Sequence, residues 1–377
     1  MNDITYDAII VGSGPAGVAA AIHLARRGLT VCLLEKESHP RYKACGGGVT
    51  ARAAALLPAA FKAAVEDPCR RVELRFWGKK QCFVARRDRP IIYMVMRTEL
   101  DALLLAEARR LGVEVLENTA AEDILEEDGR VSILTARGAK TGRFVIAADG
   151  ATSLVARKSG WPDNHSAIPA LECEVATDPA TLDRFRGCAR FDLEHPRKGY
   201  SWVFPKKDHL SVGVLSMARG AAGLKDSLHT YLDSLGIRPV SPLEPRGALI
   251  PVKPRPGPHV RGRVLLAGDA AGLAEPICAE GISNALISGA LAARAIAEGA
   301  PDPARVATIY VRELRASVLR ELEIAARHAR LLYDHPRLQG IMFQLKGKAV
   351  CEKLTDIIMG EKSLSSIGGP FGQLFGS

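Results

Sequence analysis

Three glycines and an acidic residue near the start of the chain have the spacing of a dinucleotide-binding turn. Gly12, Gly14 and Gly17 follow the apolar run at 8–11, and Glu35 closes the next apolar run. In such a turn the first glycine allows a tight strand-to-helix connection, the second admits a pyrophosphate, and the third packs helix on strand. The following helix offers unpaired N–H groups to the phosphates. An acid at position 35 can bind both hydroxyls of an adenosine ribose, which favours FAD or NAD over NADP.

A second carboxylate is expected at the edge of the same sheet. The apolar run at 264–267 ends in Gly268-Asp269, just before a glycine-rich helix entry. There Asp269 can contact the ribitol hydroxyls of a flavin. Gly281 and Ile282 open a later helix, whose positive N-terminal end can face the flavin pyrimidine.

Two further segments carry residues suited to chemistry. Cys45 precedes three glycines on a loop that comes directly after the ribose-binding strand, so it is a candidate proton donor or positioning group. The alternative is a small residue packed against the cofactor. Tyr200, Trp202 and Phe204 alternate along a predicted strand and therefore share one side of it. That side is either a core face or the apolar wall of a ligand tunnel, in which the Tyr200 hydroxyl can pass a proton.

Composition is that of a globular enzyme. The chain has 377 residues, 47% of them hydrophobic, and a formal net charge of +9. Its eight cysteines show no C-x-x-C pair and there is no histidine cluster, so no metal site is predicted. Basic residues concentrate at 70–89 without an aromatic platform, which disfavours nucleic acid. No signal peptide is recognised, and a cytoplasmic location is expected.

The pattern of elements predicts an α/β fold: a Rossmann-like FAD-binding domain, an inserted antiparallel-sheet substrate domain and a C-terminal helical region. The predicted FAD-binding domain is discontinuous and comprises residues 1–70, 97–160 and 262–300. The predicted β-rich substrate domain comprises residues 71–96 and 161–261, and the helical region comprises residues 301–377.

These motifs together carry a family resemblance. The early glycine turn with Glu35, the middle Ala148-Asp149-Gly150 and the late Gly268-Asp269 resemble the flavoprotein hydroxylase superfamily, which binds FAD. Within it, the P-x-x-x-x-C-G-G-G run at 40–48 and the Y-x-W-x-F-P run at 200–205 resemble the geranylgeranyl reductase family. The resemblance implies FAD-dependent saturation of isolated double bonds in a prenyl chain. The two family motifs fall in different predicted lobes.

The chain departs from the family pattern at two loops. Relatives usually read Pro-x-Thr-Gly-Glu-Gly-Ile where this chain has Pro276-Ile277-Cys278-Ala279-Glu280-Gly281-Ile282. The family's G-x-G after the Phe-Pro pair is Gly213-Val214-Leu215 here. The carried-over catalytic residues are Cys45, Tyr200 and Trp202. The expected cofactor-binding residues are Gly12, Ser13, Gly14, Ala16, Gly17, Glu35, Lys36, Gly47, Gly48, Arg97, Asp269, Gly281 and Ile282.

Partners and alternatives follow from the same motifs. No second G-x-G-x-x-G occurs, so electrons are expected from transiently docked NAD(P)H or from reduced ferredoxin, whose acidic surface would suit the basic residues at 70–89. A prenyl lipid is the expected substrate, and Lys346, Lys348 and Lys353 beside apolar residues at 341–358 suggest peripheral membrane contact. A flavin monooxygenase and a non-catalytic lipid-binding or electron-carrying flavoprotein are the alternative functions.

Overall fold

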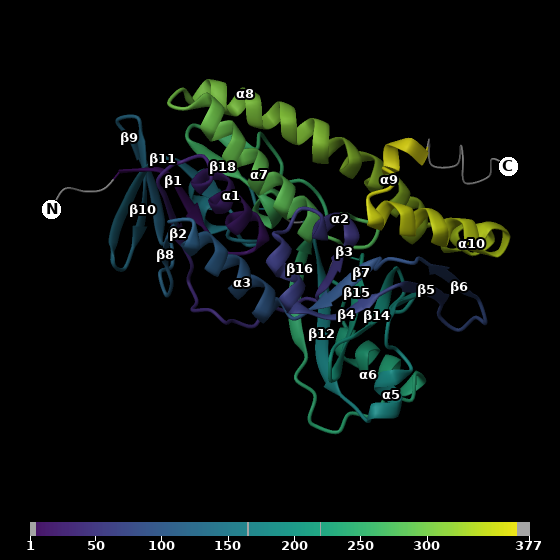
Figure 1. The fold of residues 1–377 in the computed structure, drawn as a ribbon. Coiled ribbons are helices and arrows are strands. Elements are labelled where there is room, and N and C mark those ends of the chain that lie inside the picture. The colour runs from purple at the N-terminus through teal and green to yellow at the C-terminus, as the bar shows by residue number, and fades with distance from the viewer. Residues whose placement is uncertain (1–4, 164–165, 219, 368–377) are drawn as a thin grey trace. The chain divides into compact units, whose positions relative to one another are not determined.

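The computed structural model describes residues 5–163, 166–218 and 220–367 of the chain (Figure 1). Its contacts divide the chain into two compact units. Unit 1 comprises the chain up to residue 41 together with residues 98–167 and 251–322. Unit 2 comprises residues 42–97, 168–250 and the chain from 323 onward. Each unit therefore collects segments that are far apart in the sequence.

Unit 1 is built on a mainly parallel sheet in the order β17-β18-β11-β1-β2-β8. Strands β9 and β10 extend β11 as an antiparallel meander. The strands are β1 (Thr5–Val11), β2 (Val31–Leu34), β8 (Glu114–Leu116), β9 (Asp123–Glu127), β10 (Arg130–Thr135), β11 (Gly138–Ala147), β17 (Val260–Arg261) and β18 (Val264–Leu266). The helices are α1 (Pro15–Ala25), α3 (Arg97–Arg110), α4 (Leu154–Lys158), η2 (Gly268–Ala271), α7 (Ile282–Gly299), α8 (Pro303–Leu314) and the π-helical turn η3 (Arg315–Leu319).

Close helix packing covers this sheet. Helices α1 and α7 cross at small residues, and a side chain at Gly289 of α7 would overlap the backbone of Ala16 in α1. The hydroxyl of Tyr310 in α8 donates a hydrogen bond to the Leu266 carbonyl oxygen at 2.6 Å, which ties α8 to β18. Because β1 and β2 are buried apolar runs, they read in the sequence as strands of a parallel sheet.

Unit 2 is built on a seven-stranded sheet in the order β16-β12-β15-β14-β13-β5-β6. The pairs β12–β15, β15–β14, β14–β13 and β5–β6 are antiparallel, and β13–β5 is parallel. A second sheet has the order β3-β7-β4. The strands are β3 (Gly48–Thr50), β4 (Val65–Cys69), β5 (Arg71–Phe76), β6 (Cys82–Arg86), β7 (Ile92–Val95), β12 (Ala167–Ala176), β13 (Cys188–Leu193), β14 (Gly199–Pro205), β15 (His209–Ser216) and β16 (Arg246–Pro251). The helices are α2 (Ala51–Ala54), η1 (Ala59–Ala64), α5 (Pro179–Asp183), α6 (Leu224–Ser234), α9 (Arg320–Asp334), α10 (Pro336–Met359) and η4 (Leu364–Ile367).

The predicted fold class is confirmed, with a parallel cofactor-type sheet, a largely antiparallel second sheet and C-terminal helices. The observed units differ from the predicted boundaries at several points. Residues 161–167 and 251–261, predicted to lie in the substrate domain, group with unit 1. Residues 42–70 group with unit 2 because β3 and β4 pair with β7. The helical segment after residue 300 is divided between the units at 322 and 323.

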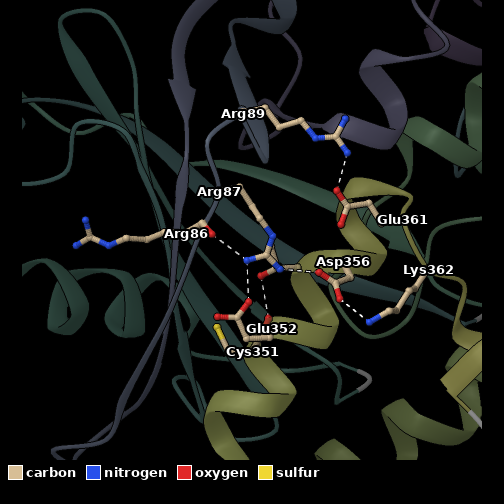
Figure 2. A network of polar contacts seen from close by, with 9 residues as sticks. Arg86, Arg87, Arg89, Cys351, Glu352, Asp356, Glu361 and Lys362 are labelled. Atoms are coloured by element: carbon tan, nitrogen blue, oxygen red, sulfur yellow. Dashed lines mark hydrogen bonds and ion pairs between the residues drawn. The ribbon is translucent and has the colours of Figure 1, made fainter.

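Ion pairs fasten helix α10 to strand β6 within unit 2 (Figure 2). Arg87 follows β6 and donates to Glu352 at 2.7 Å and to Asp356 at 2.6 Å, both on α10. Arg89 pairs with Glu361 beyond the end of α10 at 2.5 Å. Two members of the predicted basic concentration at 70–89 are therefore already neutralised by carboxylates of the same unit.

A glycine of α10 sets how closely that helix approaches β6. A side chain at Gly347 would overlap the ring of Phe83, and the helix is kinked at Lys346. We predict that Gly347→Ala lowers the free energy of unfolding by about 1–3 kcal/mol, because overpacking outweighs the gain in helix propensity. Gly340→Ala on the same helix is the matched control, since its new methyl group would meet only the flexible end of Lys79 at 3.3 Å.

The control should leave stability unchanged or raise it by up to about 1 kcal/mol, the helix-propensity difference between glycine and alanine. Urea unfolding followed by circular dichroism measures both variants. Equal effects of the two substitutions would contradict the assigned packing of α10 on β6.

Candidate functional site

The glycine turn of unit 1 has the close contacts that its spacing predicts. Gly12 lies at φ +99°, and a side chain there would overlap the Ala148 carbonyl oxygen. A side chain at Gly17 would overlap the Gly12 carbonyl oxygen, so strand and helix approach to backbone contact. Gly14, in contrast, has no protein atom within 4 Å of the position a Cβ would take.

The N-terminus of α1 opens beside Gly14. Helix α1 begins at Pro15, and no side chain caps its first turn. Its free N–H groups and the uncovered backbone at Gly14 form a cradle that suits a pyrophosphate. Ala16 is buried in the first turn of the helix.

Glu35 follows β2 and lies beside this turn. Its carboxylate accepts hydrogen bonds from the Ser13 amide at 3.0 Å, the Ser13 hydroxyl at 2.5 Å and the Glu37 amide at 3.1 Å. Burial favours the neutral acid, but these hydrogen bonds outweigh burial and lower the pKa of Glu35. The ionised carboxylate keeps further lone pairs with which to accept from sugar hydroxyls. Its neighbour Lys36 is exposed.

The second predicted part of the cofactor site also lies in unit 1. Asp269 is in η2, directly after β18, and the position of a Cβ on Gly281 would be 3.5 Å from its Oδ1 atom. Gly281 is the N-cap of α7, Ile282 is the buried first residue of that helix, and Glu280 accepts from the Ser283 amide at 2.7 Å. The Asp269 carboxylate and the N-terminus of α7 are therefore adjacent. Their contact with a flavin stays a prediction.

Arg255 in unit 1 is a structural residue that sequence reasoning missed. It is 3% exposed, and its guanidinium donates to the carbonyl oxygens of Ala270 at 2.8 Å and Pro162 at 2.7 Å. Its amide donates to the Ala271 carbonyl oxygen at 2.9 Å. These bonds brace the turn that carries Asp269. An arginine among prolines in the sequence gave no local signal of this role.

In unit 2 the Cys-Gly-Gly-Gly segment lies directly against the aromatic strand. The position of a Cβ on Gly46 would be 2.8 Å from the Trp202 indole nitrogen and 3.0 Å from the Phe204 ring. A Cβ on Gly48 would be 3.3 Å from the same phenylalanine ring. Cys45 is half-buried, and its Sγ atom accepts a hydrogen bond from the Gly47 amide at 3.4 Å. The two family motifs, expected in different lobes, are thus neighbours in one unit because β3 pairs with β7.

The aromatic residues share one face of β14, as their alternation predicts. Tyr200, Trp202 and Phe204 are 5%, 6% and 8% exposed, while Val203 faces the opposite side and packs in the core with Tyr231 of α6. The Trp202 indole lies over Gly213 of β15, where any side chain would overlap it. Arg97, another predicted cofactor contact, is the first residue of α3 and is 8% exposed.

A buried lysine is hydrogen-bonded to the backbone of the Cys45–Gly48 loop. Lys206 follows β14, is fully buried, and donates to the carbonyl oxygens of Gly46 at 2.9 Å and Val95 at 2.7 Å. Burial lowers the pKa of Lys206, an effect that the nearby Glu174 opposes. Gly47 lies at φ +68°, and a Cβ there would be 2.5 Å from the lysine Nζ atom. No motif in the sequence indicated this role of Lys206.

A buried glutamate on β12 contacts the same loop. Glu172 is 2% exposed and accepts a hydrogen bond from the Tyr42 hydroxyl, and the Cys45 amide also stabilises its charge. Its Oε2 atom is buried without a hydrogen-bond partner among the described residues. Burial, and then the nearby charge of Glu174, raise the pKa of Glu172 to about 7. This residue too was missed, because only the β12–β15–β14 register brings it to the loop.

The raised pKa of Glu172 predicts a pH dependence of stability. The folded protein holds the proton more tightly than the unfolded chain, whose ordinary value is 4.5. The stabilisation is complete below about pH 4.5 and is lost as pH rises through about 7. It amounts to about 3 kcal/mol for a shift of this size. Glu172→Gln should remove this slope, measured as urea unfolding across that pH range; parallel curves for the two proteins would contradict the burial of an ionisable acid.

Comparisons with known proteins agree with the geometry of unit 1. Residues 5–214 match the family model of an FAD binding domain. Digeranylgeranylglycerophospholipid reductase 2 of Methanothermobacter thermautotrophicus is 29% identical over 369 residues, covering 91% of this chain and 92% of that protein. The geranylgeranyl diphosphate reductase of Rhodobacter capsulatus is 30% identical over 306 residues, covering 77% of this chain and 74% of that protein.

The fold is shared with a solved structure. A geranylgeranyl bacteriochlorophyll reductase-like protein from Thermoplasma acidophilum superposes with a TM-score of 0.76 at 24% identity, covering 97% of this chain and 94% of that one. The FAD-binding match and the two reductase relatives identify an FAD-dependent oxidoreductase. The chain belongs to the geranylgeranyl reductase family, within the flavoprotein hydroxylase superfamily.

Proposed function

We propose that this flavoprotein saturates isolated carbon–carbon double bonds in a prenyl chain of the geranylgeranyl type. The observation that carries the proposal is the contact of the Cys45–Gly48 loop with Trp202 and Phe204 in unit 2. Cys45, which precedes Gly46 in the chain, offers a proton donor, and the buried aromatic residues offer an apolar surface. Both are needed to add hydrogen to an unpolarised alkene. The reductase relatives support the same reaction class.

The chain's own residues have three tasks in this reaction. Bound FAD, when reduced, supplies a hydride to one carbon of the double bond. The Cys45 thiol donates a proton to the neighbouring carbon, or positions the group that does so. Trp202 and Tyr200 form the apolar wall that keeps water away and fixes which bond is presented. Gly14, Glu35 and Asp269 hold the cofactor in unit 1.

The electron donor is proposed to be NAD(P)H or a reduced ferredoxin. The only G-x-G-x-x-G of the sequence is used by the turn at Gly12, which leaves transient docking as the route. The ion pairs of Arg87 and Arg89 reduce the positive charge that an acidic carrier would meet. This weakens the electrostatic argument for ferredoxin and favours a direct comparison of the two donors.

Product analysis tests the proposal against its two alternatives. We expect the protein, reduced anaerobically, to add the mass of two hydrogen atoms per double bond to geranylgeranyl diphosphate or a geranylgeranyl ether lipid. Addition of oxygen in air would indicate a monooxygenase, and no change of mass would indicate a non-catalytic flavoprotein. Cys45→Ala should slow the oxidation of the reduced flavin by substrate roughly 10²–10⁴-fold while FAD content is kept. Trp202→Ala should instead change the product pattern or the accepted chain length.

We propose, in addition, that α10 makes peripheral contact with an anionic membrane. Of the apolar residues at 341–358, Met342, Phe343 and Val350 are buried and serve the core of unit 2. The exposed stripe consists of Leu338, Ile341 and Leu345, which are 47%, 51% and 67% exposed. Exposed Arg337 and Lys348 flank it. No helix within the described ranges is long and apolar enough to cross a membrane.

Basic residues beside an exposed apolar stripe have the character of an interfacial helix. We predict that Ile341→Ser with Leu345→Ser weakens binding to phosphatidylglycerol vesicles at least about tenfold, because two apolar side chains no longer leave water. Val240→Ser is the matched control, since Val240 is a single apolar residue at 70% exposure outside α10. Sedimentation with vesicles measures all three proteins. Equal binding by the double variant and wild type would refute the α10 contact.

A further inference from the structure

The strongest unexplained feature of unit 2 is the buried acid beside the catalytic loop. Glu172 lies on the face of the sheet that carries the aromatic wall, since its cross-strand partner Gly213 is also the partner of Trp202. One of its carboxyl oxygens accepts from the Tyr42 hydroxyl, and the other is buried without a hydrogen-bond partner among the described residues. An unpaired carboxylate oxygen in the interior is costly, and protonation removes most of that cost.

The surroundings of Glu172 provide a path for protons from solvent to the loop. Tyr42 is 44% exposed, so the residue that contacts the buried carboxyl also reaches water. The backbone amide of Cys45 lies at the same carboxyl group, so Cys45 is a direct neighbour of Glu172. Tyr42, Glu172 and Cys45 are therefore successive neighbours, starting from the solvent-exposed Tyr42. Each of these side chains can hold or pass a proton.

We propose that Glu172 is a proton-relay residue, which takes protons from solvent through the Tyr42 hydroxyl and passes them to the Cys45 sulfur. This inference rests on the proposed function, because it assigns the supply of the proton that alkene reduction consumes. Glu172 acts through Cys45 and does not itself touch the substrate.

The relay balances in protons and charge. The S–H bond of Cys45 breaks as a C–H bond forms on the alkene, while the hydride comes from the reduced cofactor. The O–H bond of Glu172 then breaks and the sulfur regains its proton, directly or over one water molecule. The Glu172 carboxylate takes the Tyr42 hydroxyl proton as the tyrosine takes one from water. Each saturated double bond therefore consumes one proton from solvent.

Charged and polar neighbours of Glu172 determine the pH at which its carboxyl group is protonated. Glu174, two residues along β12, disfavours the Glu172 carboxylate, whereas the Tyr42 hydroxyl, the Cys45 amide and the Lys206 ammonium favour it. Glu174 is itself 3.1 Å from the His209 imidazole of β15. These opposing effects leave the pKa of Glu172 at about 7, where it can both hold and release a proton near neutral pH.

The pH profile of a single turnover tests the relay. Protein carrying FAD is reduced with dithionite and mixed anaerobically with geranylgeranyl diphosphate, and flavin oxidation is followed over a pH series centred on about 7. We expect the wild-type rate to fall as pH rises through that value, since an acid must be protonated to donate. Glu172→Gln keeps the size of the side chain and the acceptor for Tyr42. It should lose this fall in rate, called the pH break below, and slow the reaction by up to roughly 10²–10⁴-fold.

Two further variants should shift the pH at which the single-turnover rate falls, in opposite directions. Tyr42→Phe removes a hydrogen bond that favours the carboxylate, so the break should move to higher pH. Glu174→Gln removes a charge that disfavours it, so the break should move to lower pH. Glu194→Gln is the matched control, because Glu194 is another half-buried acid of unit 2 whose pKa burial raises, and it should leave the break in place.

Infrared difference spectra separate failure of the relay from failure of the proposed function. They detect the carbonyl stretch of a protonated carboxylic acid in the substrate-free protein, and this band should titrate near pH 7 and vanish in Glu172→Gln. If wild type does not react with geranylgeranyl diphosphate but the band titrates, the substrate proposal fails. If wild type reacts and Glu172→Gln retains the wild-type pH break, or is slowed equally at every pH, the relay is overturned.

Discussion

The arrangement of unit 2 depends on the hydrogen bonds that the buried ammonium group of Lys206 donates to two backbone carbonyl oxygens. A cation in the interior is tolerated only where polar groups surround it, and here two carbonyl oxygens accept from it at 2.7 and 2.9 Å. One belongs to Gly46 and the other to Val95 at the end of β7, so a single side chain fixes the Cys45–Gly48 loop to the small sheet. Its position after Pro205 ties both to the aromatic strand. Loss of this cation would leave two buried acceptors without their donor.

Backbone contact at glycine is the second constraint, and it acts in both units. In unit 1 the strand, turn and helix approach so closely at Gly12 and Gly17 that a methyl group would overlap a carbonyl oxygen. In unit 2, Gly46 and Gly48 admit the indole and phenyl rings of the aromatic strand in the same way. The glycines that identify the family in the sequence are therefore positions where backbone meets backbone or ring. Their spacing in the sequence therefore reflects the close packing of the chain at these positions as well as ligand binding.

What could be predicted from the sequence follows from how local each feature is. The glycine turn and Glu35 lie within one strand–helix–strand segment, so their spacing was sufficient to predict a dinucleotide cofactor of the FAD or NAD type. Glu172 could not be recognised, because its role depends on the pairing of β12 with β15 and of β15 with β14. Ala279 is a case in which a change from the family sequence can be understood from local backbone conformation alone. It lies at φ +55°, in the left-handed region that favours glycine, and the family pattern has glycine at this position.

The departure from the family's G-x-G has a similar physical explanation. Gly213 is kept because the Trp202 indole lies on it, and any side chain would displace that ring from the wall. The second position is Leu215, a buried residue that pairs with Tyr200 across the strands. There the close approach is provided by the opposite strand, because a side chain at Gly199 would overlap the Leu215 carbonyl oxygen. The chain thus retains the glycine that the tryptophan requires and gains apolar volume beside Tyr200, at the end of the wall farthest from the Lys206 contact.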